Sequence, residues 1–153
     1  MNAIRAVRAG MSGTIAMTAL FLLEPLVGLP KIAEGGILST VMSVSVAHFP
    51  VGFAGGWAIH FFVGIVLALL YARLLVQRLP GTPPARGALY GGLVFVVAQL
   101  ALMPLVGAGV FSSGDVQRLA GSLLGHLAYG GVVGWIYGEP STIVGGGGTP
   151  KPA

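Results

Sequence analysis

The sequence predicts an all-α integral membrane protein with four transmembrane helices. Of the 153 residues, 55% are hydrophobic and only 8% are charged, whereas a soluble domain carries about a quarter charged residues. So few charges could not cover a surface that faces water, and the surrounding medium is therefore lipid. Four apolar stretches are also long enough, at about 20 residues each, to cross the hydrocarbon core of a bilayer.

The predicted spans cover residues 8–28, 53–75, 87–107 and 119–138, within one domain of residues 1–138. Between the first two spans, residues 37–49 are apolar but too short to cross, which favours an interfacial or re-entrant element. Asp115 precedes the fourth span and is expected to cap that helix, with Arg118 as its partner one turn later. Residues 139–153 contain four consecutive glycines and predict a flexible tail.

The basic residues predict the orientation of the spans. Arginines precede the first span and surround the turn between the second and third, and such residues favour the cytoplasmic side. They are Arg5, Arg8, Arg73, Arg78 and Arg86. We therefore expect both termini in the cytoplasm, in a multi-pass protein of the cytoplasmic (inner) membrane. Because the basic residues are few and lie at segment ends, they do not form a nucleic-acid-binding stripe.

One pattern of residues occurs in both halves of the chain. It consists of a histidine, a glycine and a tyrosine at the same spacing, and its copies are His60, Gly64 and Tyr71, and His126, Gly130 and Tyr137. Pro-Leu-Val-Gly also occurs twice, at residues 25–28 and 104–107. The repetition predicts a duplicated helical hairpin, a parallel repeat whose twofold axis runs along the membrane normal.

Small residues recur at every fourth position along the second and fourth spans. This spacing is typical of a helix face that packs closely on another helix. The residues expected at such contacts are Gly56 and Gly64 in the second span, and Ser122, Gly130 and Gly134 in the fourth.

Three stretches that contain these histidines and glycines, residues 56–64, 121–130 and 135–138, resemble a family of small four-span prokaryotic membrane proteins of unknown function. The similarity extends over about residues 5–138. It implies the four-helix architecture, and it implies no activity, cofactor or site residue.

The candidate site is a layer of polar side chains inside the apolar spans. Counted at about 1.5 Å per residue from the cytoplasmic ends, its members lie about 18–24 Å deep. They are Glu24, His60, Gln99 and His126. In one interpretation the layer is structural, and each imidazole bonds to Gln99, Glu24 or a backbone carbonyl.

In the alternative interpretation, His60 and His126 are the two axial ligands of a b-type haem, with neighbouring glycines leaving room for the macrocycle. A copper or zinc site would need Glu24 as a further ligand. The chain has no cysteine and shows no phosphate loop, nucleophile elbow or zinc-protease motif. We therefore expect a protein without catalysis of its own, an accessory or structural subunit of a larger membrane complex, such as a respiratory or redox one. The alternative is a haem-binding subunit.

Overall fold

The structure, a computed structural model, describes residues 1–23, 26, 28, 45–46, 49–50, 52–105 and 107–138. Within these residues the protein is helical apart from one pair of two-residue strands. Four helices are long and apolar enough to cross a membrane, over Ala3–Leu23, Gly55–Leu75, Pro83–Leu105 and Val116–Tyr137. The prediction of an all-helical protein with four membrane-length helices is confirmed.

The long helices are built from seven elements. These are α1 (Ala3–Leu23); α4 (Gly52–Leu70), which continues into the π-helix η2 (Tyr71–Leu75); α5 (Pro83–Val97), which continues into the π-helix η3 (Ala98–Leu102) and α6 (Met103–Leu105); and α7 (Val116–Tyr137). The strands β1 (Ser45–Val46) and β2 (Phe49–Pro50) pair antiparallel, and the 3-10 turn η4 (Val110–Gly114) precedes α7. Most of the predicted interfacial element and the whole predicted tail lie outside the described residues.

Three helices begin before the apolar runs that predict them, since α1 starts at Ala3, α5 at Pro83 and α7 at Val116. The first turn of a helix needs no apolar side chain, because its free N–H groups face water or a cap. Pro83 suits the start of α5, where a missing N–H costs nothing. The predicted cap of α7 is confirmed: Asp115 accepts a 3.1 Å hydrogen bond from the Arg118 amide and pairs with the Arg118 guanidinium.

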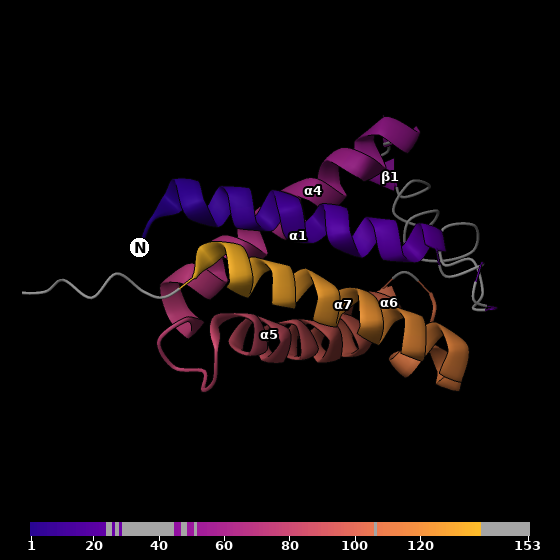
Figure 1. The fold of residues 1–153 in the computed structure, drawn as a ribbon. Helices are drawn as coiled ribbons and strands as arrows, with labels where there is room; N and C mark the ends of the chain where they lie inside the picture. The colour runs from indigo at the N-terminus through magenta and orange to yellow at the C-terminus, as the bar shows by residue number, and fades with distance from the viewer. Residues whose placement is uncertain are drawn as a thin grey trace, which may run out of the picture.

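The helices form a bundle in which α7 packs between α1 and α5, and α4 packs against α1 (Figure 1). The N-terminus, the turn between η2 and α5 and the end of α7 lie together at one end of this bundle. There the Arg5 guanidinium donates a 3.1 Å hydrogen bond to the Tyr137 carbonyl. We call this end the basic end, because it holds the five arginines that predict the cytoplasmic side.

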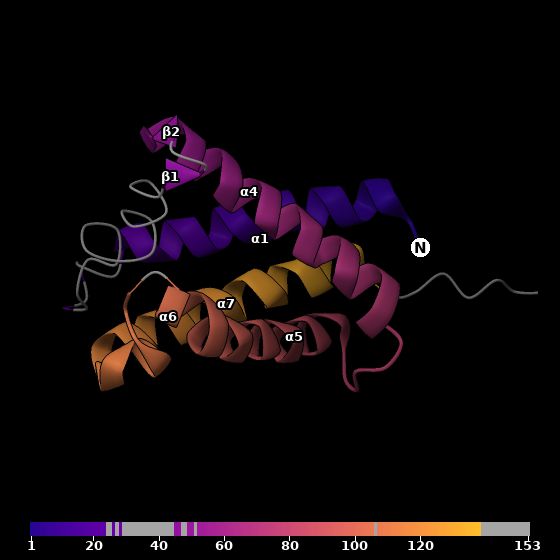
Figure 2. The same ribbon diagram turned by 180° about the vertical axis from the view of Figure 1, so that it is seen from behind.

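Three aromatic rings bring the second and third long helices together near the basic end. The Tyr71 ring lies 5.2 Å from the Tyr90 ring and 6.1 Å from the Tyr137 ring, and the Tyr90 hydroxyl donates a 2.7 Å hydrogen bond to the Leu67 carbonyl. Toward the opposite end, α4 diverges from α5 (Figure 2). The bundle is therefore closed at the basic end and spread apart at the other.

The closest helix contact is between α5 and α7, and it is made of glycines. A Cβ atom at Gly130 would overlap the Gly87 carbonyl, and one at Gly134 would overlap the Pro83 carbonyl. In return, a Cβ atom at Gly91 would overlap the His126 carbonyl. The two backbones touch along this line, as small residues at four-residue spacing permit in membrane helices.

The contacts of α1 use the same principle. A Cβ atom at Gly10 would lie 2.8 Å from the Cα atom of Ile65 in α4, and one at Gly13 would lie 2.8 Å from the Val133 side chain in α7. Gly64 leaves space for the Thr14 side chain, which is buried. These contacts hold α1 between α4 and α7.

Candidate functional site

A cavity of about 290 Å³ lies between the four long helices, in the region where α4 diverges from α5. Side chains from α1, α4, α5, η3 and α7 line it, and both predicted histidines are among them. The remaining described lining is almost wholly aliphatic and aromatic, and its other polar groups are the hydroxyls of Thr14, Thr18 and Tyr129 and the indole N–H of Trp57. The structure therefore brings His60 and His126 to one site.

His126 is held in one orientation at this cavity. The ring is only 7% exposed, and its Nδ1 atom lies 2.7 Å from the Ser122 carbonyl oxygen one turn earlier. A carbonyl accepts hydrogen bonds and never donates them, so Nδ1 carries the proton of the neutral ring. Nε2 then has a free lone pair, and no side chain of the described residues donates a hydrogen bond to it. The Phe95 ring packs edge to face on the imidazole at 5.8 Å.

His60 reaches the same cavity from α4 and is half-buried. Its Nε2 atom lies 3.2 Å from the Thr18 hydroxyl of α1. The rings of Trp57 and Phe61 lie edge-on and 6.1 Å and 5.9 Å away on the same helix. His60 thus connects α4 to α1, while the hydrogen bond of His126 within the described part of the chain is to its own helix.

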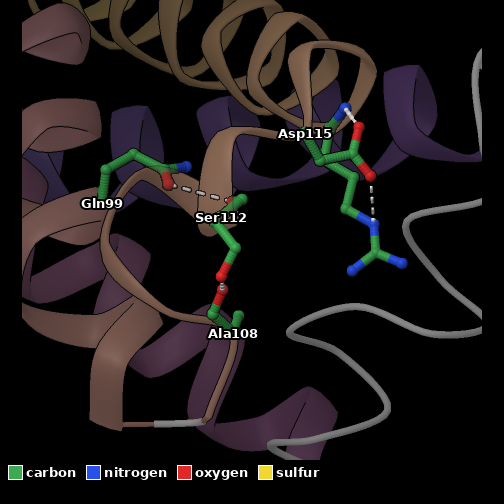
Figure 3. A network of polar contacts seen from close by, with 6 residues as sticks. Gln99, Ala108, Ser112 and Asp115 are labelled. Carbon is green, nitrogen blue, oxygen red and sulfur yellow. Dashed lines mark hydrogen bonds and ion pairs between the residues drawn. The ribbon is translucent and has the colours of Figure 1, made fainter.

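Gln99 is fully buried in the π-helix η3 and bonds to neither histidine. Its amide nitrogen donates a 3.2 Å hydrogen bond to the Ser122 hydroxyl. Its amide oxygen accepts a 3.0 Å hydrogen bond from the Ser112 hydroxyl (Figure 3). The predicted layer is therefore divided into a cavity with two histidines and a separate network centred on Gln99, and Ser122 contacts both.

The segment that Gln99 holds has an unusual backbone. Phe111, Ser112 and Ser113 have φ angles of 48°, 50° and 54°, in the left-handed region that costs a non-glycine residue about 1–2 kcal/mol. The Ser112 bond to Gln99 and a 3.0 Å bond from the Ser113 hydroxyl to the Ala108 carbonyl stabilise this turn (Figure 3). The turn connects the end of the third span to the cap of α7.

The remaining predicted residues fall into two groups. Glu24 lies outside the described residues. Of the predicted packing residues, Gly130 and Gly134 contact α5, Gly64 contacts α1, Ser122 bonds to Gln99, and Gly56 is buried. Among the described residues, no group of three or more histidine, cysteine, aspartate or glutamate side chains is placed to hold a metal ion.

Several residues that form contacts in this region are not among those predicted from the sequence. Gly87 and Gly91 face the fourth-span glycines, and their four-residue spacing is a signal that could have identified them. The Tyr129 hydroxyl donates a 2.6 Å hydrogen bond to the Gly64 carbonyl across the bundle. Neither that bond nor the contact between Thr18 and His60 has a sequence signal, because each joins helices far apart in the chain.

Comparison with known proteins identifies the family of this chain but does not identify an activity. The chain matches the family model described as "Family of unknown function (DUF6789)" over residues 1–144. No curated protein and no solved structure matches it significantly. Since the family match covers nearly the whole sequence, the protein belongs to the family of unknown function DUF6789.

Proposed function

We propose that this protein is a multi-pass subunit of the cytoplasmic membrane that holds a small apolar molecule between its helices and works within a larger membrane assembly. The observation that carries the proposal is the 290 Å³ cavity with both histidines in its wall. Ligand sites are typically concave and mostly apolar, with a few polar groups that orient the ligand. This cavity has that composition.

A binding role needs less from the site than catalysis does. The polar groups of the described lining are two imidazoles, three hydroxyls and the indole N–H of Trp57. The Thr14 and Tyr129 hydroxyls already donate to the Gly10 and Gly64 carbonyls. General acid–base chemistry would further require one of these groups to lie within hydrogen-bond reach of a proton of the substrate. The arrangement offers hydrogen bonds to a ligand, and it supports the expectation of an accessory subunit.

Native mass spectrometry of protein released from membranes in mild detergent tests this function. We expect an adduct of one apolar molecule per chain, and further subunits in the largest species. Ala101→Trp should reduce the adduct because Ala101 lines the cavity. Leu105→Trp is the matched control, since Leu105 is 83% exposed outside the cavity. A wild-type chain that carries neither adduct nor partner would contradict the proposal.

A second candidate, a haem subunit, is favoured by the His126 geometry. An axial histidine usually donates Nδ1–H to a carbonyl and binds metal through Nε2, and His126 makes that first bond to Ser122. His60 would be the second ligand, and in this structure its Nε2 atom contacts the Thr18 hydroxyl. The group would supply electron-transfer chemistry, while these residues would hold and orient it.

An optical spectrum of the purified protein separates the two candidates. A haem subunit should show a Soret band that His60→Ala and His126→Ala each abolish or shift, because each removes an axial nitrogen. Leu123→Ala is a suitable control, since that side chain lies on α7 outside the cavity lining. The absence of a Soret band after expression with haem precursor would rule out the haem alternative.

The proposed duplication gives a reason for the position of the cavity. If α1–α4 and α5–α7 are two copies of one hairpin, the α1–α7 contact corresponds to a contact between α5 and α4. The α1–α7 contact is closed, because Gly13 of α1 lies against α7. In the proposed repeat Gly92 of α5 corresponds to Gly13, and a Cβ atom at Gly92 would meet nothing nearer than 3.9 Å. The cavity lies beside the open contact between α4 and α5. Tyr71 and Tyr137 are equivalent residues in the proposed repeat, and the contact between their rings supports the same symmetry.

The proposed orientation places the basic end in the cytoplasm. Single cysteines at Thr82 and Ser113 are both exposed, at opposite ends of the bundle, and the natural chain has no cysteine to interfere. In intact cells, a reagent that does not cross the membrane should label Thr82→Cys only after lysis and Ser113→Cys directly. Labelling of Thr82→Cys from outside would reverse the topology.

A further inference from the structure

We propose that the cavity binds a neutral lipid with a free hydroxyl group, which enters sideways from the bilayer between α4 and α5 and donates its hydrogen bond to Nε2 of His126. The inference rests on the proposed binding function and names the class of ligand. The shared chemistry is an O–H donor on an apolar body, as in a monoacylglycerol or a long-tailed hydroquinone.

The chemistry of the head group follows from His126. His126 lines the cavity, its side chain is more than nine-tenths buried, and its Nδ1–H is used by the Ser122 carbonyl. No described residue donates a hydrogen bond to its Nε2 atom, which is therefore the acceptor that remains for a ligand in the cavity. An unsatisfied acceptor in an apolar site is costly. A ligand that donates to it relieves this cost, whereas a ligand with acceptors alone does not.

The charge of the ligand follows from the rest of the lining. None of the described lining residues is an arginine, lysine, aspartate or glutamate. A charged head group would therefore have no counter-ion among these lining residues, and burying it beside them would be expensive. The ligand is accordingly neutral.

The route of entry follows from the divergence of α4 and α5 (Figure 2). Val63 of α4 and Val97 of α5 both line the cavity and are also 46% and 64% exposed. The apolar space therefore continues to the outer surface of the bundle between these two helices. A volume of 290 Å³ is at the lower end for drug-sized ligands, so a long tail would extend through this opening into the lipid.

Trp57 offers a direct test, because it lines the cavity and the second tryptophan, Trp135, is 70% exposed. In the Trp135→Phe background, a monoacylglycerol with a dibrominated chain should quench the fluorescence of Trp57. The matching dibrominated methyl ester, which has no hydroxyl, should bind roughly three- to tenfold more weakly, the range that one net hydrogen bond supplies. Equal affinities for the two molecules would overturn the inference.

Two variants separate the head group from the entrance. His126→Leu should remove the preference for the hydroxyl while the methyl ester still binds. Val97→Trp should weaken the binding of both molecules because the larger side chain blocks the opening. Residue 97 lies at the surface, so this substitution does not disturb the core. Leu93→Trp, one turn earlier, 51% exposed and outside the lining, is the control. Equal effects of Val97→Trp and Leu93→Trp would contradict lateral entry at this point.

Competition distinguishes the two sources of the hydroxyl. A decyl benzoquinol should displace the brominated lipid better than the corresponding quinone, which lacks the donor. If the quinol displaces the brominated lipid at a lower concentration than unlabelled monoacylglycerol does, the ligand is a hydroquinone. If monoacylglycerol acts at the lower concentration, the ligand is a glycerolipid. If quinone and quinol compete equally, no donor is recognised and the inference fails. If nothing quenches Trp57, the proposed binding function itself fails.

Discussion

Replacing Gly130 with alanine is expected to destabilise the bundle by about 1–3 kcal/mol or more, the usual cost of inserting atoms into a packed contact. The new methyl group would overlap the Gly87 carbonyl and lie 2.7 Å from the Gly91 nitrogen. Both neighbours are backbone atoms, so no side-chain rotation can make room. Relief requires α5 and α7 to move apart, and this would weaken the closest helix contact in the described bundle. A thermal melt in detergent should show the loss as a lower transition temperature.

The adjacent glycine supplies the control for this experiment. A Cβ atom at Gly131 would meet only the Pro84 carbonyl, at 4.0 Å. Gly131→Ala should therefore be neutral or slightly stabilising, because alanine is the better helix former by up to about 1 kcal/mol. The third-span pair Gly91→Ala and Gly92→Ala should behave in the same way, with only the first harmful. Equal melting of Gly130→Ala and Gly131→Ala would show that the glycines do not form the helix contact.

Replacing Gln99 with leucine is expected to destabilise the protein by about 1–3 kcal/mol and to release the turn before α7. The change removes the bonds to the Ser122 and Ser112 hydroxyls and leaves both without this partner. Ser112 sits in the left-handed turn of Phe111 to Ser113, which then loses one of its two side-chain hydrogen bonds. Melting temperature reports the stability, and hydrogen exchange of residues 110–114 reports the turn.

An exposed glutamine in the turn that follows the second long helix serves as the control. Gln77→Leu makes the same chemical change at a surface position, and surface substitutions usually change stability by no more than about 0.5 kcal/mol. Exchange of residues 110–114 should be faster only in Gln99→Leu. If the two variants melted alike and protected the turn alike, Gln99 would not hold this segment.

Properties that depend on one stretch of chain are readable from the sequence alone. Four helices long and apolar enough to cross a membrane follow from the apolar runs of the sequence, and the Asp115 cap follows from a residue type beside a helix start. The glycine spacing of the fourth span marks a face that fits another helix, and Gly130 and Gly134 do face α5. Each of these features needs no knowledge of which segments become neighbours.

Only the tertiary structure decides which faces meet. A soluble helix shows its inner side as an apolar stripe, but a membrane helix is apolar toward lipid and toward its neighbours alike, so periodicity does not distinguish them. For this reason the contact of Gly87 and Gly91 with α7, the bond from Gln99 to Ser112 and the divergence of α4 from α5 appear only in the folded bundle, although the spacing of the two glycines is visible in the sequence. The equal spacing of the two histidines predicts that they lie at a shared depth. The cavity that both of them line is visible only in the folded bundle, because four helices contribute its wall.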